Sequence, residues 1–344
     1  MELKNKRILV LGGTGSLGQA LINRQSKENQ LIVVSRDEAK HWTIRNRLSS
    51  DQHVDFRVAD IRDHDRIMNI IRDLDPQIII LAAALKQVDT CERSPHESIQ
   101  TNLIGIQNVV NAVLELESVC KSLETVLMVS TDKACAPTNV YGMSKAISER
   151  VVTSSISRTG RVKFVGVRYG NVLESRGSII PLFKYQTQIG TKLTVTHESM
   201  TRFIMTLDQS IDLIEHTICL GKSSEIWLPK LRSMRIMDLA EIFASKFGAG
   251  IEITGIRPGE KMHEELISET ESIRVKEEAQ YFCLLSSLSQ MPVVERTFSY
   301  SSNHVIMEIS ELQSYLESIN VLDMELSDFP GREINEISIK KRDA

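Results

Sequence analysis

The chain has 344 residues, of which 42% are hydrophobic and 25% are charged, and its formal net charge is −4. This length leaves room for one large α/β domain and a smaller lobe, and the near balance of charges gives no electrostatic basis for binding nucleic acid or an anionic membrane. The longest uninterrupted apolar run, Ile78–Leu85, is far shorter than the roughly 20 residues of a membrane-spanning helix.

The cysteines and the N-terminus indicate the compartment. Five cysteines are scattered without the CxxC or CxxH spacing of metal sites: Cys91, Cys120, Cys135, Cys219 and Cys283. We therefore expect reduced thiols in a cytoplasmic protein, and no metal site. The short apolar run near the N-terminus leads into a glycine motif rather than a small-residue cleavage site, so we expect no signal peptide.

A glycine-rich loop follows the first expected strand, Arg7–Leu11. Three glycines have the G-x-x-G-x-x-G spacing and enclose polar and apolar residues of the same loop: Gly12, Gly15 and Gly18, with Thr14, Ser16 and Leu17. Such glycines allow a tight turn, a close approach of backbone to pyrophosphate, and close packing of the next helix, here Leu17–Arg24. A strand before the loop and an amphipathic helix after it are the context of a dinucleotide-binding site.

The residues after the second strand, Leu31–Val34, bear on the choice of cofactor. NAD sites usually place an acid here to bind the ribose 2′-hydroxyl. This chain instead has Ser35 and Arg36, and a hydroxyl with a guanidinium suits a 2′-phosphate. We therefore expect NADP, while the adjacent Asp37 leaves NAD as the less favoured alternative.

The third and fourth strands also end in residues placed to contact the cofactor. Two follow the strand Val54–Val58 and would meet the adenine, one polar and one apolar: Asp60 and Ile61. Three follow the strand Gln77–Ala82, where small side chains let a ribose approach the backbone and a lysine projects from the sheet: Ala82, Ala83 and Lys86. Alternatively, Asp60 or Asp63 could cap the helix expected over Asp63–Leu74.

The stretch Ser130–Lys145 carries the candidate chemistry. It follows the buried strand Val126–Val129 and becomes helical near Tyr141, so Tyr141 and Lys145 lie on one helix face. An ammonium beside a phenol is expected to lower the phenol pKa, so that the tyrosine can take a proton from an alcohol while hydride leaves the same carbon. Thr131 could hold the substrate hydroxyl in place.

Asp132 and Lys133 form a second reactive pair at the end of the same strand. A carboxyl and an amine at the mouth of a sheet can act as acid and base if burial tunes their pKa values. An adjacent Asp-Lys can also be a simple surface ion pair. Its position between a strand end and a Tyr-x-x-x-Lys motif favours chemistry.

Alternating strands and helices predict a Rossmann-type α/β fold, a doubly wound parallel sheet over residues 1–172 with NADP bound to it. Residues 173–344 should form a smaller mixed α/β substrate lobe and a tail, and some of these elements could return to the sheet. Three arginines of this half could clamp a diphosphate, although each alone could be a surface salt bridge: Arg176, Arg202 and Arg257. Helices are expected over Ile99–Leu116, Ile180–Ile189, Leu207–Leu220, Arg235–Phe247 and Ser310–Leu316, and a strand over Ile251–Ile256.

Together these residues resemble the extended short-chain dehydrogenase/reductase family of nucleotide-sugar enzymes. More narrowly, they resemble the inverting UDP-N-acetylglucosamine 4,6-dehydratases of bacterial polysaccharide and flagellin-sugar synthesis. The matching stretches span Gly12 to Ser268: GGTGSLG, SRDE, AAALKQVDTCERSPHESIQTN, STDKA, PTNVYGMSK, RYGNVLESRGS, MTRF and IRPGEKMHEELIS. The glycine loop and Tyr-x-x-x-Lys identify only the superfamily, whereas STDKA with RYGNVLESRGS and IRPGEK is narrower.

The resemblance implies a redox-neutral lyase reaction. Tyr141, with Lys145, would take the proton of the sugar C4 hydroxyl while NADP⁺ accepts hydride. Lys133, with a lowered pKa, would remove the C5 proton, and Asp132 would protonate the leaving C6 hydroxyl. Hydride then returns to C6 and a proton is added at C5 on the opposite face, giving UDP-2-acetamido-2,6-dideoxy-β-L-arabino-hex-4-ulose. The implied substrate contacts are Lys86, Asn171, Arg202, Arg257 and Glu260.

Other functions stay open at this level. A retaining 4,6-dehydratase or a nucleotide-sugar 4-epimerase could use the same scaffold, although an epimerase needs no base at C5. A protein that binds NADP as a sensor, without catalysis, is the non-enzymatic alternative. The resemblance also implies a homo-oligomer, a dimer or hexamer, that pairs through the helices Ile99–Leu116 and Gly142–Ser157.

Overall fold

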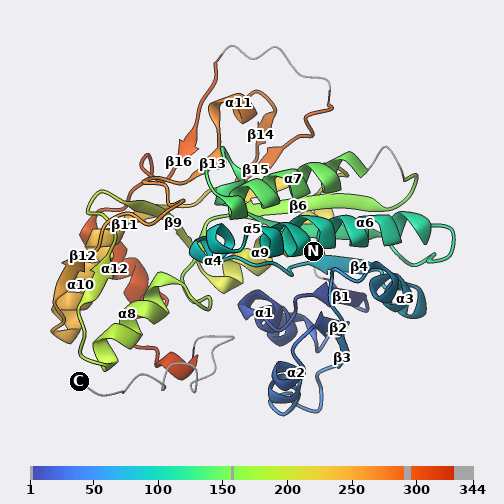
Figure 1. Cartoon of the computed structure of the whole chain (residues 1–344), viewed down its shortest axis with the longest axis horizontal. Coiled ribbons are helices and arrows are strands. Elements are labelled where there is room, and N and C mark those ends of the chain that lie inside the picture. Colours follow the sequence, from blue (N-terminus) through green and yellow to red (C-terminus); the bar gives the residue numbers. More distant parts are fainter. Residues whose placement is uncertain (1–2, 156–158, 290–295, 329–344) are drawn as a thin grey trace.

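The computed structural model describes residues 3–155, 159–289 and 296–328. Its centre is a nine-stranded sheet with the order β14-β15-β10-β6-β5-β4-β1-β2-β3 (Figure 1). From β3 to β10 every neighbouring pair is parallel, and β15 and β14 add an antiparallel edge. The Rossmann-type α/β fold is therefore confirmed. The strands are β1 (Arg7–Leu11), β2 (Gln30–Ser35), β3 (Val54–Val58), β4 (Ile78–Leu81), β5 (Thr125–Thr131), β6 (Lys163–Tyr169), β10 (Ile226–Pro229), β14 (Val275–Glu277) and β15 (Tyr281–Leu284).

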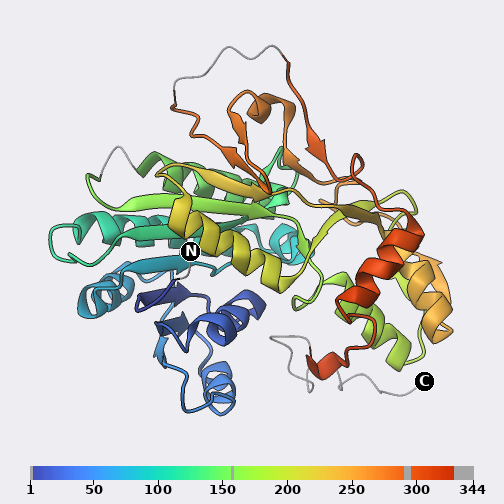
Figure 2. The same ribbon diagram turned by 180° about the vertical axis from the view of Figure 1, so that it is seen from behind.

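Each face of the sheet has its own hydrophobic core, because successive side chains of a strand point to opposite faces. In β1, Ile8 and Val10 enter one core, while Leu9 and Leu11 enter the other. This double burial explains why the strands are continuous apolar runs. The first core is covered by α1 (Ser16–Gln25) and α9 (Leu207–Leu220), and α2 (Glu38–Arg45) adds Ile44 at its edge. The second core is covered by α3 (His64–Leu74), α6 (Gly105–Glu115) and α7 (Val140–Ser154) (Figures 1 and 2).

A third core lies in a lobe beside the carboxyl ends of the strands (Figure 1). Its helices are α8 (Ile179–Gln188), α10 (Ile236–Phe247) and α12 (Ile309–Ser318), and its parallel strand pair is β8 (Leu193–Val195) and β12 (Ile251–Ile253). A three-stranded sheet, β11-β9-β7, begins where β6 ends: β11 (Ser233–Arg235), β9 (Thr201–Met205) and β7 (Asn171–Val172). Within the described ranges, no helix is long and apolar enough to cross a membrane.

The structure differs from the expected elements in several places. The helix expected over Ile99–Leu116 is divided into α5 (Pro95–Ile99), a π-helical turn (Gln100–Ile104) and α6. The strand expected over Ile251–Ile256 ends at Ile253. Strand β9 was not expected, and β10, β14 and β15 return to the large sheet from beyond residue 172. Strands of three to five residues are too short to show a periodicity of their own.

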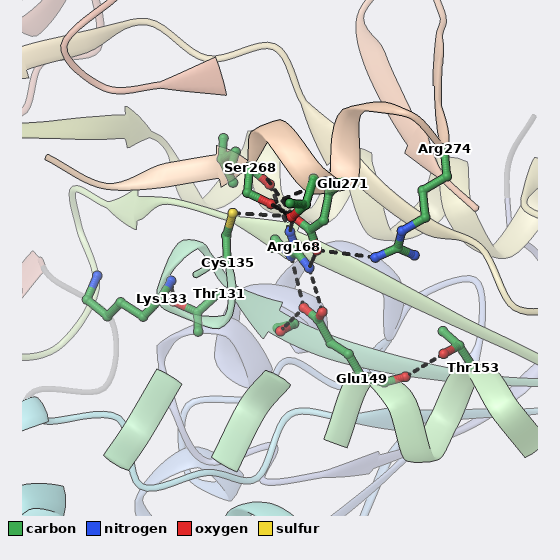
Figure 3. Close-up of polar contacts among 12 residues, drawn as sticks. Thr131, Lys133, Cys135, Glu149, Thr153, Arg168, Ser268, Glu271 and Arg274 are labelled. Carbon is green, nitrogen blue, oxygen red and sulfur yellow. Dashed lines mark hydrogen bonds and ion pairs between the residues drawn. The ribbon is translucent and has the colours of Figure 1, made fainter. Parts of the chain in front are cut away.

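One buried arginine connects the returning segment to the sheet. Arg168, at the end of β6, is 1% exposed and lies between Glu149 of α7 and Glu271 of α11 (Glu269–Ser272) (Figure 3). Its guanidinium donates to both oxygens of each carboxylate, at 2.6 to 3.0 Å, and to the Leu266 carbonyl at 2.9 Å. All five N–H groups of the side chain thus have an acceptor. We call Arg168, Glu149 and Glu271 the arginine clamp.

The arginine clamp makes stability depend on pH. Burial alone would raise the pKa of Glu271, but the guanidinium of Arg168 outweighs it and lowers that pKa from 4.5 to about 2. Because the folded pKa is depressed, this stabilisation is complete above about pH 4.5 and is lost as the pH falls towards 2. Its size is about 3 kcal/mol.

Glu271→Gln is therefore expected to lower the free energy of unfolding at neutral pH by about 3 kcal/mol, since it leaves Arg168 buried with one carboxylate. The variant should also lose less stability than the wild type as the pH falls from 4.5 to 2. Urea unfolding at a series of pH values measures both effects. Glu277→Gln is the control, because its ion pair with Lys230 is on the surface and contributes less than about 1 kcal/mol. Parallel pH curves for wild type and Glu271→Gln would contradict this account.

Candidate active site

The loops after the carboxyl ends of the parallel strands line a cavity of about 680 Å³. This edge is where open α/β sheets bind ligands. All the site residues expected from the sequence except Arg176 line it: Gly12, Thr14, Gly15, Ser16, Leu17, Gly18, Ser35, Arg36, Asp60, Ile61, Ala82, Ala83, Lys86, Thr131, Asp132, Lys133, Tyr141, Lys145, Asn171, Arg202, Arg257 and Glu260. Arg176 lies close by, and its backbone N–H donates to Ser16 Oγ at 2.9 Å.

The glycine loop has the shape of a phosphate cradle. Gly12 has a φ of +87°, and a Cβ there would lie 2.5 Å from the Ala83 nitrogen. A Cβ on Gly18 would lie 2.2 Å from the Gly13 carbonyl oxygen, so α1 can pack this tightly only with glycine. The N-cap of α1 is Gly15, which has no capping side chain, and the first turn of a helix offers N–H groups to an anion. These features fit the pyrophosphate of a dinucleotide.

Basic and polar side chains gather at the end of β2. The side chain of Arg36 is 54% exposed, and its Nη1 lies 3.5 Å from Asp60 Oδ2. Asp37 caps α2 (Glu38–Arg45) by accepting from the Lys40 N–H, and it also pairs with Lys40 Nζ at 2.7 Å. Ser35, Arg36, Asp37 and Lys40 all line the cavity, and the carboxylate of Asp37 is bound to the first turn of its own helix and to Lys40. Lys40 was missed from the sequence, although it lies only two residues after the SRDE motif.

Tyr141 and Lys145 lie on the first two turns of α7, which packs directly on the short 3₁₀ turn Asp132–Ala134. A Cβ on Gly142 would lie 2.1 Å from the Lys133 carbonyl oxygen, so glycine sets this close approach. Asn139 caps α7 by accepting from the Gly142 N–H at 2.8 Å. The catalytic candidates of the turn and of the helix are thus fixed to one another.

The pKa values of this tyrosine and lysine differ from the expectation. Burial raises the pKa of Tyr141 to about 12, although the charge of Lys133 acts in the opposite direction. Burial also lowers the pKa of Lys145 to about 8, against the opposing effect of Glu149. Lys145 Nζ donates to the Val129 carbonyl at 2.7 Å. The expected lowering of the phenol pKa is therefore wrong for the protein without bound ligands, because burial disfavours the phenolate.

Asp132 and Lys133 form a buried cluster with Glu264. Lys133 Nζ lies 3.0 Å from Asp132 Oδ1 and 3.2 Å from Glu264 Oε1. The second oxygen of each carboxylate is buried and has no hydrogen-bond partner in the described part of the chain. Thr131 Oγ1 donates to Asp132 Oδ1 at 2.9 Å, so Thr131 is bound to the cluster. Glu264 was missed from the sequence, because nothing in its local pattern links it to residues so distant along the chain.

This cluster also corrects one expectation. Burial raises the pKa of Asp132, which suits a general acid. Burial would lower the pKa of Lys133, but the attraction of Asp132 and Glu264 outweighs it, so the pKa of Lys133 lies above its ordinary value. The expected lowering of the Lys133 pKa is therefore wrong for the free site. Lys133 is an ammonium held between two carboxylates.

The remaining candidates are Lys86, Asn171, Arg202, Arg257 and Glu260, which line the same cavity. Burial, assisted by the charge of Arg176, lowers the pKa of Lys86 to about 8. Asn171 Oδ1 is buried and has no partner among the described residues, so it can accept a hydrogen bond from a ligand. Arg202 is buried and donates to the carbonyls of Thr201 and Met262. The side chain of Arg257 is 53% exposed beside Glu260. In the described segments, no three His, Cys, Asp or Glu side chains group as a metal site requires.

Comparison with known proteins identifies the family of this chain. Residues 8–286 match the family described as polysaccharide biosynthesis protein. The chain is 34% identical to a UDP-N-acetylglucosamine 4,6-dehydratase (inverting) of Campylobacter jejuni, over 92% of this chain and 97% of that protein. It is also 34% identical to a UDP-glucose 4-epimerase of Rickettsia prowazekii, over 88% of each chain. An uncharacterized membrane protein of Methanocaldococcus jannaschii is 40% identical over 80% of this chain and 84% of its own.

One solved structure is similar to this chain over most of its length. The X-ray structure of Pen from Bacillus thuringiensis has a TM-score of 0.85 and 31% sequence identity, and the match covers 93% of this chain and 99% of Pen. The family match includes the glycine loop, the Tyr141–Lys145 helix and the Asp132–Lys133–Glu264 cluster. The chain belongs to the polysaccharide biosynthesis protein family.

Proposed function

We propose that the protein is a UDP-N-acetylglucosamine 4,6-dehydratase that inverts C5, a hydro-lyase of deoxy-amino-sugar and polysaccharide synthesis. The observation that carries this proposal is the buried Asp132–Lys133 pair, placed beside Tyr141 in the same cavity as the glycine loop. Elimination of water across C5 and C6 needs a base that removes the C5 proton and an acid that protonates the C6 hydroxyl. The Campylobacter relative of the same name supports this substrate. The product would be UDP-2-acetamido-2,6-dideoxy-β-L-arabino-hex-4-ulose.

NADP is the cofactor that we propose. The glycine loop and the N-terminus of α1 would hold its pyrophosphate, Asp60 and Ile61 its adenine, and Ala82 and Ala83 its ribose. When bound, the nicotinamide ring accepts a hydride from sugar C4 and later supplies it to C6. Ser35, Arg36 and Lys40 favour a 2′-phosphate over a 2′-hydroxyl, because two cations and a hydroxyl donor face the cavity there.

The chain's own residues would manage the protons. Tyr141, with Lys145, takes the C4 hydroxyl proton, and the neighbouring charge of Lys133 offsets part of the rise that burial causes in the phenol pKa. Thr131 orients Asp132 through its hydrogen bond. Lys133 removes the C5 proton as an amine, and Asp132 gives its proton to the C6 oxygen, which leaves as water. Burial keeps bulk water from competing with these transfers.

The UDP-sugar would lie between the cofactor and the lobe. Arg202 and Arg257 can bind the diphosphate, with Arg176 close to the same region, and Glu260 can accept from the uridine. Lys86 and Asn171 are placed to contact the sugar, and the orphaned Asn171 Oδ1 supports this assignment.

A 4-epimerase or a retaining 4,6-dehydratase is the second candidate. The Rickettsia relative named UDP-glucose 4-epimerase favours the epimerase. Against it stands the Asp132–Lys133 pair, since exchange of configuration at C4 requires no base at C5. A sensor that only binds NADP would not require this pair either.

Location and assembly complete the proposal. The five cysteines are free thiols, which supports the cytoplasm, where thiols stay reduced. Cell fractionation that left the protein outside the cytosol would contradict this location. The outward sides of the π-helical turn and of α7 expose Ile104, Met143 and Ile147 at 38%, 47% and 52%, which supports pairing of two copies there.

The dehydratase proposal is tested with UDP-N-acetylglucosamine in D₂O, without added reductant. We expect loss of one water, one deuterium at C5 and an inverted C5, detected by mass spectrometry and proton NMR. Lys133→Ala should bind UDP like the wild type but eliminate water at least about 100-fold more slowly, because the base is missing. Lys192→Ala, in an exposed loop, is the control and should be fully active.

Other results of this assay would assign a different function or a different base. Normal elimination by Lys133→Ala would remove Lys133 from the mechanism. Water loss with retained C5 configuration would assign the protein to the retaining dehydratases. Exchange of configuration at C4 without water loss would establish the epimerase.

Arg36→Ala is expected to weaken NADP binding by roughly 10- to 100-fold, which corresponds to one hydrogen bond between charged groups. NAD binding should not change, because NAD lacks the 2′-phosphate. Isothermal titration calorimetry with both nucleotides measures the difference, and Arg47→Ala, exposed and outside the cavity, is the control. An equal loss for both nucleotides would contradict a 2′-phosphate role for Arg36.

The proposed assembly gives one more expectation. Ile147→Glu should convert the oligomer into a smaller species, because it places a charge in an apolar contact. Sedimentation velocity measures the size, with the exposed and distant Ile253→Glu as the control. A monomeric wild type would contradict the proposal.

A further inference from the structure

Glu264 belongs to the same cluster as Asp132 and Lys133, although it comes from the other half of the chain. It directly precedes β13 (Glu265–Ile267), and its side chain is 2% exposed. Lys133 Nζ lies 3.2 Å from its Oε1 and 3.0 Å from Asp132 Oδ1. The amine is therefore held between two buried carboxylates that approach from different elements.

We propose that Glu264 is a positioning residue of the elimination step: it orients the Lys133 amine towards C5 and stabilises the charge that Lys133 gains there. This inference rests on the proposed function, in which Lys133 takes a proton from carbon. An ammonium has no lone pair, so Lys133 must first give up one of its own protons.

The proton count of the cluster allows this without an external acid or base. In the free site, the transferable proton is on Lys133, which the attraction of Asp132 and Glu264 keeps as an ammonium. Its transfer to Asp132 along the 3.0 Å contact gives a carboxylic acid and a neutral amine at the same net charge. The C5–H bond then breaks as a new N–H bond forms, and its electron pair becomes the C5–C6 double bond. The C6–O bond breaks, and the oxygen leaves as water with the proton of Asp132.

The two carboxylates are unequal, which directs this proton. Burial and the charge of Glu264 raise the pKa of Asp132, although Lys133 opposes them. Burial acts in the same direction on Glu264, but Lys133, Arg202 and Lys261 outweigh it and lower the pKa of Glu264. Asp132, which lies 3.0 Å from Lys133 Nζ and has the raised pKa, is therefore a better acceptor of the Lys133 proton than Glu264, which has the lowered pKa. An ionised Glu264 can hold the neutral amine by accepting one N–H and can stabilise the ammonium that forms.

Charged and titratable side chains face Lys133 from four parts of the structure. Asp132 lies on its own turn, Glu264 before β13, Arg202 on β9 and Tyr141 on α7. The two carboxylates raise the pKa of Lys133, while Arg202 lowers it. Removal of the charge of Glu264 should therefore lower the pKa values of both Lys133 and Asp132 together.

Glu264→Gln tests this inference, because it keeps the shape and removes the charge. We expect kcat for water elimination to fall roughly 100-fold, with an unchanged Kd for UDP. Both limbs of the pH–rate profile should move to lower pH, by roughly 1 to 3 pH units. Glu264→Asp keeps the charge on a shorter side chain, so it should show the wild-type pH profile with a reduced kcat.

A second readout does not depend on turnover. NMR of protein labelled with ¹⁵N at lysine Nζ should show Lys133 as an ammonium throughout the pH range of the folded wild type, and titrating at lower pH in Glu264→Gln. Glu265→Gln is the matched control, since this neighbouring side chain lines a different surface hollow. It should leave kcat, pH profile and Lys133 titration unchanged.

Each result of these measurements either supports or overturns the positioning role of Glu264. Wild-type kcat and pH profile in Glu264→Gln would overturn the inference, and so would a loss of kcat accompanied by no shift in the profile or the titration. If Glu264→Gln does not fold, a shifted profile or a wild-type kcat in Glu264→Asp would overturn it. A wild type that eliminates no water refutes the proposed function, while the lysine titration still tests the coupling of Glu264 to Lys133.

Discussion

The arginine clamp is the interaction on which the rest of the structure depends. It joins β6, α7 and the segment that returns from the lobe, and these three elements carry or adjoin most of the candidate catalytic side chains. Cys135 Sγ donates to Glu271 Oε2 at 3.3 Å, so the clamp also supports the turn Asp132–Ala134 from behind (Figure 3). Buried ion pairs often add little net stability, but they tolerate few alternative arrangements. The clamp therefore fixes the geometry of these elements, and removal of one of its partners is costly.

The candidate site depends on burial as much as on residue type. The same low-dielectric environment raises the pKa of Asp132 and Tyr141 and lowers that of Lys145. Lys133 and Glu264 depart from this pattern, because the opposite charges around each of them outweigh burial. The pKa values of Asp132 and Lys133 thus depend on a third residue, Glu264, as well as on each other. Asp132 and Lys133 are neighbours in the sequence, and in the structure Glu264 joins them in a cluster of three.

The sequence predicted the parallel sheet well, because its strands are continuous apolar runs separated by amphipathic helices. All of the site residues that it predicted except Arg176 line the cavity, because the motifs follow the carboxyl ends of those strands. It did not predict β14 and β15, whose three and four residues are partly polar and pair antiparallel. Glu264 and the direction of the Lys133 pKa escaped prediction for one reason: both depend on contacts between segments far apart in the chain, which no local pattern records.

The long separation within the arginine clamp has a consequence for biosynthesis. Arg168 and Glu271 are 103 residues apart in the chain. At a translation rate of 5–20 residues per second, roughly 5 to 20 s pass between the synthesis of the guanidinium and that of its second carboxylate. During this interval the sheet has an open edge at β6 and β10, since β15 is made later still. The nascent chain therefore cannot complete the arginine clamp before most of the lobe has been synthesised.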